Sequence, residues 1–364
     1  MLGEGDHCRV YLEGDRVHKV ARHAAAARAL AREATFLEKC ASRLVPRVLD
    51  QGPGYLVQSF VAGSPLDAQE WLLWSPYEQD RLRDDLWDFL GSLPRGWIHG
   101  DLSPDHLRIE NRKLVGVIDF GDVSPGQLDY ELRYLPEDLG LEFFRHFCPD
   151  PQLYHQAIRF SMLDSLGYLL RHPECQTEIE RQLQLQEAEV GALPERMFRQ
   201  AVVSDAEELA GCINRAYRSG QGWSHEAALL EGPRTSAEEL ETELFETNCH
   251  FESMWSHRGQ LLGCVCWERR QRELHLGMLS VLPEFQDQRL GAALLERTHQ
   301  QARDWQCTQV RLTVIAQRQE LVDYYRRRGF SDTGRRLPFP DDPRVGRPRV
   351  ELELMEMSQD CCPD

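Results

Sequence analysis

Two short apolar runs in the first half of the chain each end in an aspartate inside a glycine-containing turn. Residues 97–109 read WIHGDLSPDHLRI and residues 115–122 read VGVIDFGD, so Asp101 and Asp119 directly follow strand-like segments. Buried strands hold such side chains rigidly, and we expect both carboxylates to reach one cleft. Phosphoryl transfer needs this pair, one for the proton of a substrate hydroxyl and one for magnesium on the phosphates. Turn capping explains one such motif well, but two at this spacing poorly.

Upstream of these motifs, a lysine and a glutamate stand where such a site requires them. Residues 10–20 alternate around Gly14, which predicts two strands joined by a turn, with Lys19 late in the second strand. Residues 23–41 are rich in Ala, Leu, Arg and Glu and predict a helix that contains Glu33. A strand lysine and a helix glutamate can form the ion pair that holds the lysine against nucleotide phosphates. Taken singly, each also fits a solvated surface position.

Together with LDYEL at residues 128–132, these segments resemble the aminoglycoside phosphotransferase-like branch of the kinase fold over residues 1–190. The resemblance implies a two-lobed domain that uses ATP or GTP with Mg²⁺. It makes Asp101 the catalytic residue and Asp119 a magnesium ligand. It also makes Lys19 and Glu33 the pair that binds the nucleotide phosphates.

Two further assignments rest on the same resemblance. The backbone at Ser59 and Phe60, late in a predicted strand that begins at residue 55, is expected to meet the adenine. His106 stands five residues after Asp101, where the family usually has an asparagine that binds the metal. We take His106 as the second metal ligand, although a neutral imidazole suits Mg²⁺ less well than oxygen does.

A break in the chain separates this region from a second one. A polar stretch rich in Gln and Glu ends at Gly191 and Pro194, and the residues after it read as a strand followed by an amphipathic helix. We therefore predict two domains, over residues 1–190 and 195–357. Each is long enough to bury its own core.

The second region contains a strand, a loop and a helix start that suit an anion. Residues 274–281 read LHLGMLSV, and a loop that carries Gly291 then opens a long helix. The N-terminal end of a helix offers backbone N–H groups and a positive dipole end, which fits a pyrophosphate. A simple strand-to-helix connection explains the loop about equally well when it is taken alone. A further strand at residues 309–316 and the helix ELVDYYRRRGF shift the balance towards a site.

The helix at residues 320–330 carries two adjacent tyrosines. A tyrosine at the end of such a helix can protonate a departing thiolate. Because Tyr324 and Tyr325 are neighbours, we expect only one of them to face inward, with the other packed in the core.

Over residues 197–357 the sequence is similar to the GNAT acetyltransferases, through VLPEFQDQRLGAALL and ELVDYYRRRGF. The resemblance implies a mixed-sheet fold that binds acetyl-CoA, with Tyr325 as the general acid. The fold class is therefore α+β, a kinase-like domain followed by a GNAT domain. The residues implied to bind the cofactor are Leu279, Ser280 and Val281 for the acetyl and pantetheine arm, and Gln286, Arg289, Leu290, Gly291 and Ala292 for the pyrophosphate.

One position of that loop departs from the family pattern. Arg289 replaces a glycine, which is tolerable if the residue avoids positive φ, and its guanidinium can add a phosphate contact.

Acceptor-side residues are less sharply indicated. Glu273 and His275 are candidates for the base that takes the amine proton, although each also fits a surface position. Residues 221–235 lie where GNAT proteins usually bind acceptors, and Trp223, His225, Glu226 and Arg234 could line that pocket. The same stretch also fits a structural feature of a subfamily.

The charge balance limits the partners. Lys and Arg total 42 against 59 Asp and Glu, for a net charge of -17, which argues against nucleic acid and favours small cationic acceptors. The sequence shows no membrane-spanning run and no export signal, so we expect a cytoplasmic protein with its 11 cysteines reduced. The charge predicts solubility and leaves the oligomeric state open.

These observations predict a bifunctional transferase that phosphorylates hydroxyls and acetylates amines, with aminoglycoside-like molecules as the acceptors that the resemblance implies. The alternative is an active acetyltransferase joined to a degenerate nucleotide-binding domain. That enzyme would act on an endogenous metabolite or a protein amine.

Overall fold

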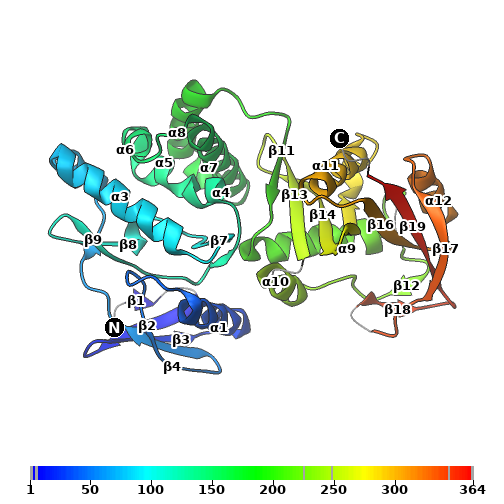
Figure 1. Ribbon diagram of the computed structural model, residues 1–364, viewed down its shortest axis with the longest axis horizontal. Helices are drawn as coiled ribbons and strands as arrows, with labels where there is room; N and C mark the ends of the chain where they lie inside the picture. Colours follow the sequence, from blue (N-terminus) through cyan, green and yellow to red (C-terminus); the bar gives the residue numbers. More distant parts are fainter. Residues whose placement is uncertain (1–2, 5–6, 224–225, 247–248, 343–344, 362–364) are drawn as a thin grey trace. The chain divides into compact units, whose positions relative to one another are not determined.

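The structure is a computed structural model of the full chain, and it describes all residues except 1–2, 5–6, 224–225, 247–248, 343–344 and 362–364. The chain divides into two compact units, Met1–Leu193 and Pro194–Asp364 (Figure 1). Among the described residues, no helix is both long enough and apolar enough to cross a membrane.

The first unit begins with a five-stranded antiparallel sheet of order β1-β2-β3-β5-β4 and continues into a mainly helical lobe. Its sheet elements are β1 (Gly3–Glu4), β2 (Cys8–Glu13), β3 (Arg16–Ala21), α1 (Ala24–Lys39), β4 (Val48–Gly52) and β5 (Tyr55–Ser59). The rest are β6 (Ser64–Pro65), α2 (Ala68–Leu72), α3 (Pro76–Ser92), β7 (Trp97–Ile98), β8 (Leu107–Glu110), β9 (Lys113–Val117), β10 (Ser124–Pro125), α4 (Leu128–Glu131), α5 (Leu135–Asp138), α6 (Gly140–Phe147), α7 (Pro151–Arg171) and α8 (Gln176–Val190).

The sheet and α1 place the lysine and the glutamate opposite each other. Strands β2 and β3 pair from Glu13↔Arg16 onward around Gly14, whose φ of +62° suits a tight turn. Helix α1 has an apolar stripe that includes Leu30 and Leu37, and it packs against β3, β4 and β5. Glu33 lies on that buried stripe, so its carboxylate points at the sheet rather than at water.

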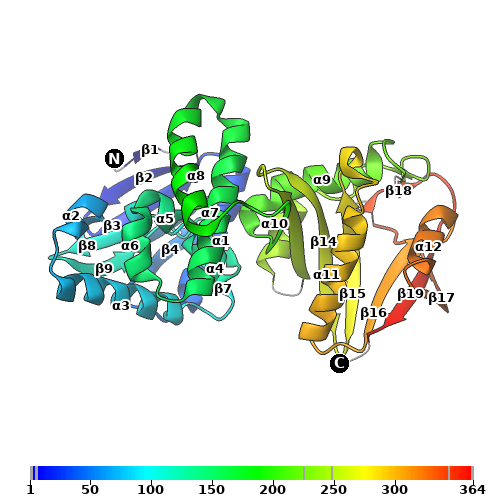
Figure 2. The ribbon, with the colours of Figure 1, turned by 90° about the horizontal axis from the view of Figure 1, so that it is seen from above.

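The helical lobe holds the two aspartate motifs together. A 3₁₀ turn (Pro104–His106) leads from Asp101 into β8, and Asp119 follows β9 of the same hairpin. The Ile118 N–H donates to the His106 carbonyl at 3.0 Å, which joins the two motifs directly. Behind them, α7 and α8 pack against each other as a pair (Figure 2).

The second unit is a seven-stranded sheet of order β11-β13-β14-β15-β16-β19-β17 with packed helices. Its elements are β11 (Arg196–Gln200), α9 (Ala206–Arg218), β12 (Leu230–Glu231), α10 (Ala237–Phe245), β13 (Cys249–Ser256), β14 (Leu261–Arg270), β15 (Glu273–Val281), α11 (Leu290–Asp304), β16 (Gln309–Ile315), α12 (Gln319–Arg326), β17 (Ser331–Pro338), β18 (Arg347–Pro348) and β19 (Glu353–Asp360).

The parallel pair β15 and β16 determines where the cavity of this unit forms. Strands β15 and β16 are paired only from Glu273↔Gln309 to Leu276↔Leu312, although β15 continues to Val281. Beyond Leu276 the two strands therefore separate. Helix α11 packs on β14, β15 and β16, and Figure 2 shows it lying along β15. The core between them contains Leu274, Leu294 and Val310, each fully buried.

Gly100 offers a test of the turn that presents Asp101. Its φ is +88°, and a Cβ there would lie 2.1 Å from the Asp122 carbonyl oxygen. We predict that Gly100→Ala lowers the free energy of unfolding of the first unit by about 2 kcal/mol or more, because backbone strain and a clash add together.

Urea denaturation measures this change, and Gly91→Ala is the matched control. Gly91 lies in α3 with no atom within 4 Å of an added Cβ, so alanine should stabilise by about 0.5–1 kcal/mol. Equal effects of the two substitutions would contradict this account of the turn.

Candidate active sites

A group of three paired charges, of which Lys19 and Glu33 are buried, forms the centre of the first unit. The Lys19 ammonium lies 2.8 and 3.0 Å from the two Glu33 carboxylate oxygens and 3.0 Å from Asp119 Oδ1. Burial favours the neutral form of Lys19, but the charges of Glu33 and Asp119 outweigh it and raise its pKa above the ordinary value. The Lys19 charge in turn lowers the pKa of Asp119 to about 2. The lysine is therefore protonated and Asp119 is ionised at neutral pH.

His106 lies between the two aspartates. Its Nδ1 is 2.7 Å from the Asp101 carbonyl oxygen and 3.6 Å from Asp101 Oδ2, whereas its Nε2 is 3.8 Å from Asp119 Oδ2. A carbonyl can only accept, so Nδ1 carries a hydrogen, and Nε2 is the ring nitrogen that faces Asp119. The sequence-predicted residues Lys19, Glu33, Asp101, His106 and Asp119 thus form one cluster.

Two residues that the motif analysis did not single out hold this cluster in place. Glu131 is fully buried and accepts hydrogen bonds from the N–H groups of His99 at 3.0 Å and Gly100 at 2.9 Å. Arg133 donates to the Gly100 carbonyl at 2.8 Å and to Asp164 at 2.6 Å. Both belong to LDYELRY, so charged residues inside an otherwise apolar segment were the available signal.

Ser59 and Phe60 do not offer free N–H groups. The Ser59 N–H donates to the Arg47 carbonyl at 2.9 Å, and the Phe60 N–H donates to the Asp15 carbonyl at 2.8 Å. Both residues line a cavity of about 700 Å³ with the end of α1 and the start of β4, and Lys19 does not line it. A contact from these N–H groups to a nucleotide base would require these hydrogen bonds to break.

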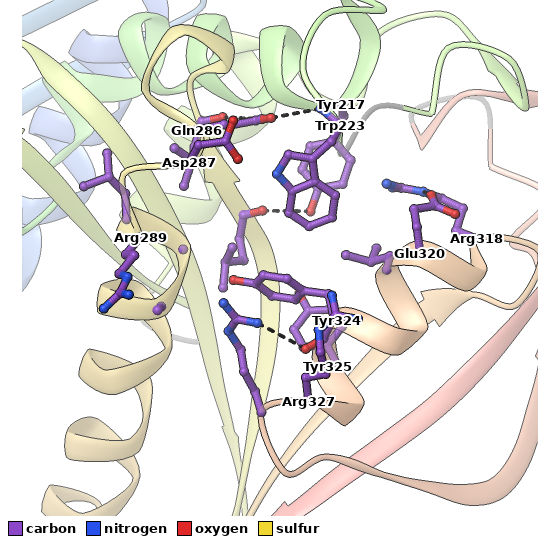
Figure 3. A pocket seen from close by; sticks show the side chains of 17 residues that line it. Tyr217, Trp223, Gln286, Asp287, Arg289, Arg318, Glu320, Tyr324, Tyr325 and Arg327 are labelled. Atoms are coloured by element: carbon purple, nitrogen blue, oxygen red, sulfur yellow. Dashed lines mark hydrogen bonds and ion pairs between the residues drawn. The ribbon is translucent and has the colours of Figure 1, made fainter.

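The cavity of the second unit lies where β15 and β16 separate, and its volume is about 470 Å³ (Figure 3). It brings together the end of β15, the start of α11 and helix α12. The residues from the sequence prediction that line it are Leu279, Val281, Gln286, Arg289, Leu290, Gly291, Ala292 and Tyr325. Ser280 is also on this strand but is buried, with its hydroxyl donating to the Met278 carbonyl at 3.0 Å.

At the start of α11, the loop is fixed by hydrogen bonds and the backbone lies close to neighbouring side chains. The Gln286 side chain donates to the Val281 carbonyl at 3.2 Å and accepts from the Trp223 N–H at 3.0 Å, which fixes the loop. A Cβ on Gly291 would lie 2.7 Å from the Tyr324 hydroxyl, so no larger residue fits there unchanged. Arg289 has φ of +60°, whereas we expect an arginine to be tolerated here only if the residue avoids positive φ. An arginine therefore occupies a left-handed position that favours glycine.

Both tyrosines of α12 line the cavity, so the prediction that only one faces inward is wrong. The Tyr324 ring lies against Trp223 at 5.1 Å between ring centroids, and the Arg328 guanidinium carbon lies 3.6 Å from the centroid of the Tyr324 ring. Tyr325 is buried, and burial raises its pKa well above the ordinary value, so it keeps its proton. The physical reason is that neighbouring residues of a helix point only about 100° apart, so a cavity along one broad side of α12 reaches both.

The candidate bases lie elsewhere. Glu273 and His275 stand at the start of β15, where His275 Nε2 is 3.4 Å from Glu273 and Glu273 is 2.9 Å from Arg311. Neither lines the cavity at the other end of the strand. Of the four acceptor candidates, Trp223 lines the cavity, Glu226 is buried, Arg234 lies over the Tyr217 ring, and His225 is outside the described residues.

Comparison with known proteins agrees with this description. Residues 78–156 match the phosphotransferase enzyme family, and residues 217–330 match the acetyltransferase (GNAT) family. The two family matches, together with the charged cluster of the first unit and the cavity of the second, identify the chain as a transferase. The chain carries a phosphotransferase-family domain and a GNAT-family domain, and both resemblances drawn from the sequence are confirmed.

Solved structures of both kinds are similar to parts of the chain. The GDP complex of a variant of aminoglycoside 2′-phosphotransferase IIIa is 22% identical, with 51% of this chain and 89% of that one covered at a TM-score of 0.43. The gentamicin complex of APH(2″)-IIa is 19% identical, with 53% and 90% covered at a TM-score of 0.42. A GNAT acetyltransferase from Streptococcus pneumoniae is 20% identical, with 46% and 100% covered at a TM-score of 0.35. No curated protein matches the sequence.

The charge cluster of the first unit can be tested by stability. We predict that Lys19→Met lowers the free energy of unfolding by about 3 kcal/mol, because Glu33 then stays buried without its cation. Combining it with Glu33→Gln should recover most of the loss in urea denaturation. Equal loss in the single and the double variant would contradict the pairing.

The loss should also depend on pH. Burial raises the pKa of Glu33, and Lys19→Met removes the cation that opposes that rise, leaving only a backbone hydrogen bond from Phe120 to oppose it. The folded variant then retains a proton that its unfolded chain has released, so stability falls as the pH rises above the unfolded value of about 4.3. Lys19→Met should therefore cost more at pH 8 than at pH 5.

Proposed function

We propose that the first unit transfers the γ-phosphoryl group of ATP or GTP to a hydroxyl of a small cationic acceptor. The observation that supports this is a single cluster of contacts. Lys19 is paired with Glu33 and Asp119, and His106 lies between Asp119 and Asp101. Lys19 would contact the nucleotide phosphates. Asp101 would take the proton of the acceptor hydroxyl as the hydroxyl oxygen bonds to the γ-phosphorus, while the bond from the γ-phosphorus to the β-phosphate oxygen breaks and the nucleoside diphosphate leaves.

The same cluster fits a divalent cation. Asp119 is ionised and about half exposed, and Nε2 of His106 faces it, so these two side chains would hold Mg²⁺. The described residues contain no group of three or more His, Cys, Asp or Glu side chains placed to hold a metal ion. When bound, the cation supplies charge neutralisation on the phosphates.

The charge around Asp101 favours a cationic acceptor. Burial and the neighbouring charges of Glu137, Asp101 and Asp105 raise the pKa of Asp138 to about 6, which shows how closely these carboxylates gather. An acceptor ammonium group placed among them would relieve their repulsion. Amino sugars of the aminoglycoside type combine such ammonium groups with hydroxyls.

We propose that the second unit transfers an acetyl group from acetyl-CoA to a primary amine. Its cavity lies where β15 and β16 separate, opposite the start of α11 and beside the protonated Tyr325. The pyrophosphate would bind at the start of α11. The amine nitrogen would bond to the acetyl carbon as the carbon–sulfur bond breaks, Tyr325 would protonate the thiolate, and the amine would release one proton to water.

A second possibility for the first unit is nucleotide binding without transfer. It is favoured by the engaged N–H groups of Ser59 and Phe60 and by the imidazole of His106 in place of an oxygen ligand. A cytoplasmic location fits both versions, because the ten cysteines that the structure describes are all free thiols.

For the first unit, we expect Asp101→Asn to lower kcat for phosphoryl transfer by about 10²–10⁴-fold, since the hydroxyl proton loses its acceptor. The assay measures phosphorylated product formed from each member of an aminoglycoside panel, so that hydrolysis of the nucleotide alone is not counted. Acetyl transfer by the same variant is the internal control and should be unchanged. Nucleotide binding without transfer by the wild type would favour the second possibility.

For the second unit, we expect Tyr325→Phe to lower kcat for acetyl transfer by about 10²–10⁴-fold with little change in acetyl-CoA affinity. Tyr324→Phe should instead weaken acetyl-CoA binding, because its hydroxyl faces Gly291 at the start of α11. Because the pKa of Tyr325 is raised, wild-type kcat should show no alkaline fall below about pH 10. A fall near pH 8 would argue against Tyr325 as the acid.

A further inference from the structure

Arg318 is a buried arginine with one unused donor. It directly precedes α12, its side chain is 3% exposed, and it lines the cavity of the second unit. Its Nε donates to Glu320 at 3.2 Å and its Nη1 donates to Glu226 at 3.4 Å. Its Nη2 is buried and has no hydrogen-bond partner among the described residues. A buried guanidinium nitrogen without an acceptor is costly, so it marks a place for a ligand.

The acidic residues next to Arg318 balance only part of its positive charge. Glu226 is buried, and its second oxygen binds Arg218. Arg218 also donates hydrogen bonds to the carbonyls of Gly232 at 3.1 Å and Val345 at 2.9 Å. Two buried guanidinium groups therefore share one buried carboxylate. Glu320 is 55% exposed, so water screens much of its charge.

Arg318 lies at the acceptor side of the cavity. In Figure 3 it stands across the cavity from Gln286 and Arg289, the loop that leads into α11, with Trp223 and Tyr324 between them. Arg318 therefore lies on the opposite side of the cavity from the helix start that suits a pyrophosphate. Burial raises the pKa of both Tyr217 and Tyr325, and the charge of Arg318 opposes the rise at both hydroxyls. Arg318 and both tyrosines line the same cavity.

We propose that the acetyl acceptor of the second unit is an amine that also carries a carboxylate, and that Arg318 binds that carboxylate through Nη2. This inference rests on the proposed acetyl transfer and names its substrate class. Arginine binds a carboxylate with charge-assisted hydrogen bonds, and the wall of Tyr217, Trp223 and Leu279 suits the carbon chain between the two groups. A free amino acid is the simplest molecule of this kind.

The two units then select acceptors of opposite character. The carboxylates around Asp101 favour an acceptor with several ammonium groups, whereas Arg318 favours one with an anionic group. An aminoglycoside has no carboxylate to offer Arg318. We therefore expect the second unit to use it poorly.

The test compares matched acceptors on the full-length enzyme. Acetyl transfer is measured with the common L-amino acids and, for each one that reacts, with the amine that lacks only the carboxylate. We expect the carboxylate form to be favoured by about 100-fold in kcat/KM, the scale of a buried charge-assisted contact. Arg318→Met should remove that preference through KM, and Arg318→Lys should retain part of it.

Arg326→Met is the matched control. Arg326 is the last residue of α12, the helix that Arg318 precedes, but it is about half exposed, pairs with Asp323 at 3.2 Å and does not line the cavity. It should leave the preference for the carboxylate unchanged. Calorimetric titration of N-acetyl-amino acids, the products, into the CoA-bound enzyme gives a second readout that does not need turnover. Their affinity should fall about 10- to 100-fold in Arg318→Met.

The possible outcomes separate this inference from the function on which it rests. Failure of the wild type to bind acetyl-CoA contradicts the proposed acetyl transfer. Binding of acetyl-CoA with equal use of both acceptor forms, or with no saturable binding of any carboxylate compound, contradicts only the role of Arg318. If Arg318→Met loses acetyl-CoA affinity as strongly as acceptor affinity, the arginine serves the cofactor and the inference is wrong.

Discussion

Lys19, Glu33 and Asp119 come from a strand, a helix and a hairpin end that are far apart in the sequence, and their charges must be paired because Lys19 and Glu33 are buried. That requirement fixes how the sheet, α1 and the β8–β9 hairpin meet. The same constraint recurs at each site. Glu131 is buried against two backbone N–H groups of the turn before Asp101, and Glu226 is buried between two arginines. Buried charges that need partners thus determine where each site can form.

The sites themselves form where regular pairing stops. In the second unit, β15 leaves β16 after Leu276, and the backbone beyond that point borders the cavity. In the first unit, Asp101 and Asp119 lie just outside the short strands that precede them, with Asp119 at φ of +64°. Strand ends give rigid positions while leaving groups free to contact a ligand, which a continuous ladder does not allow.

How far the sequence could predict these sites depends on the distance over which each signal acts. The cluster around Asp101 follows from local motifs, because each strand end and turn is encoded within about ten residues. The roles of Glu131 and Arg133 depend on contacts with a turn some thirty residues earlier, which no local pattern records. The left-handed backbone of Arg289 contradicts its residue type and appears only in the fold.

Arg318 shows the same limit for the second unit. Its sequence neighbourhood reads as an ordinary helix start, and its significance comes from Glu226, which lies 92 residues away, and from the cavity around it. The pair of tyrosines illustrates the opposite error. Helical spacing argues that neighbours face different directions, yet the cavity reaches both Tyr324 and Tyr325.

The central claim is that one chain holds two independent cofactor sites. Thermal denaturation of the wild type and of Asp119→Ala, each with acetyl-CoA, ATP–Mg²⁺ or GTP–Mg²⁺, tests it most directly. A ligand at about 100 times its Kd adds about 2.7 kcal/mol to the stability of the unit that binds it. We expect acetyl-CoA and one nucleotide each to stabilise the wild type, and Asp119→Ala to lose only the nucleotide effect. Stabilisation of the wild type by acetyl-CoA alone would contradict it.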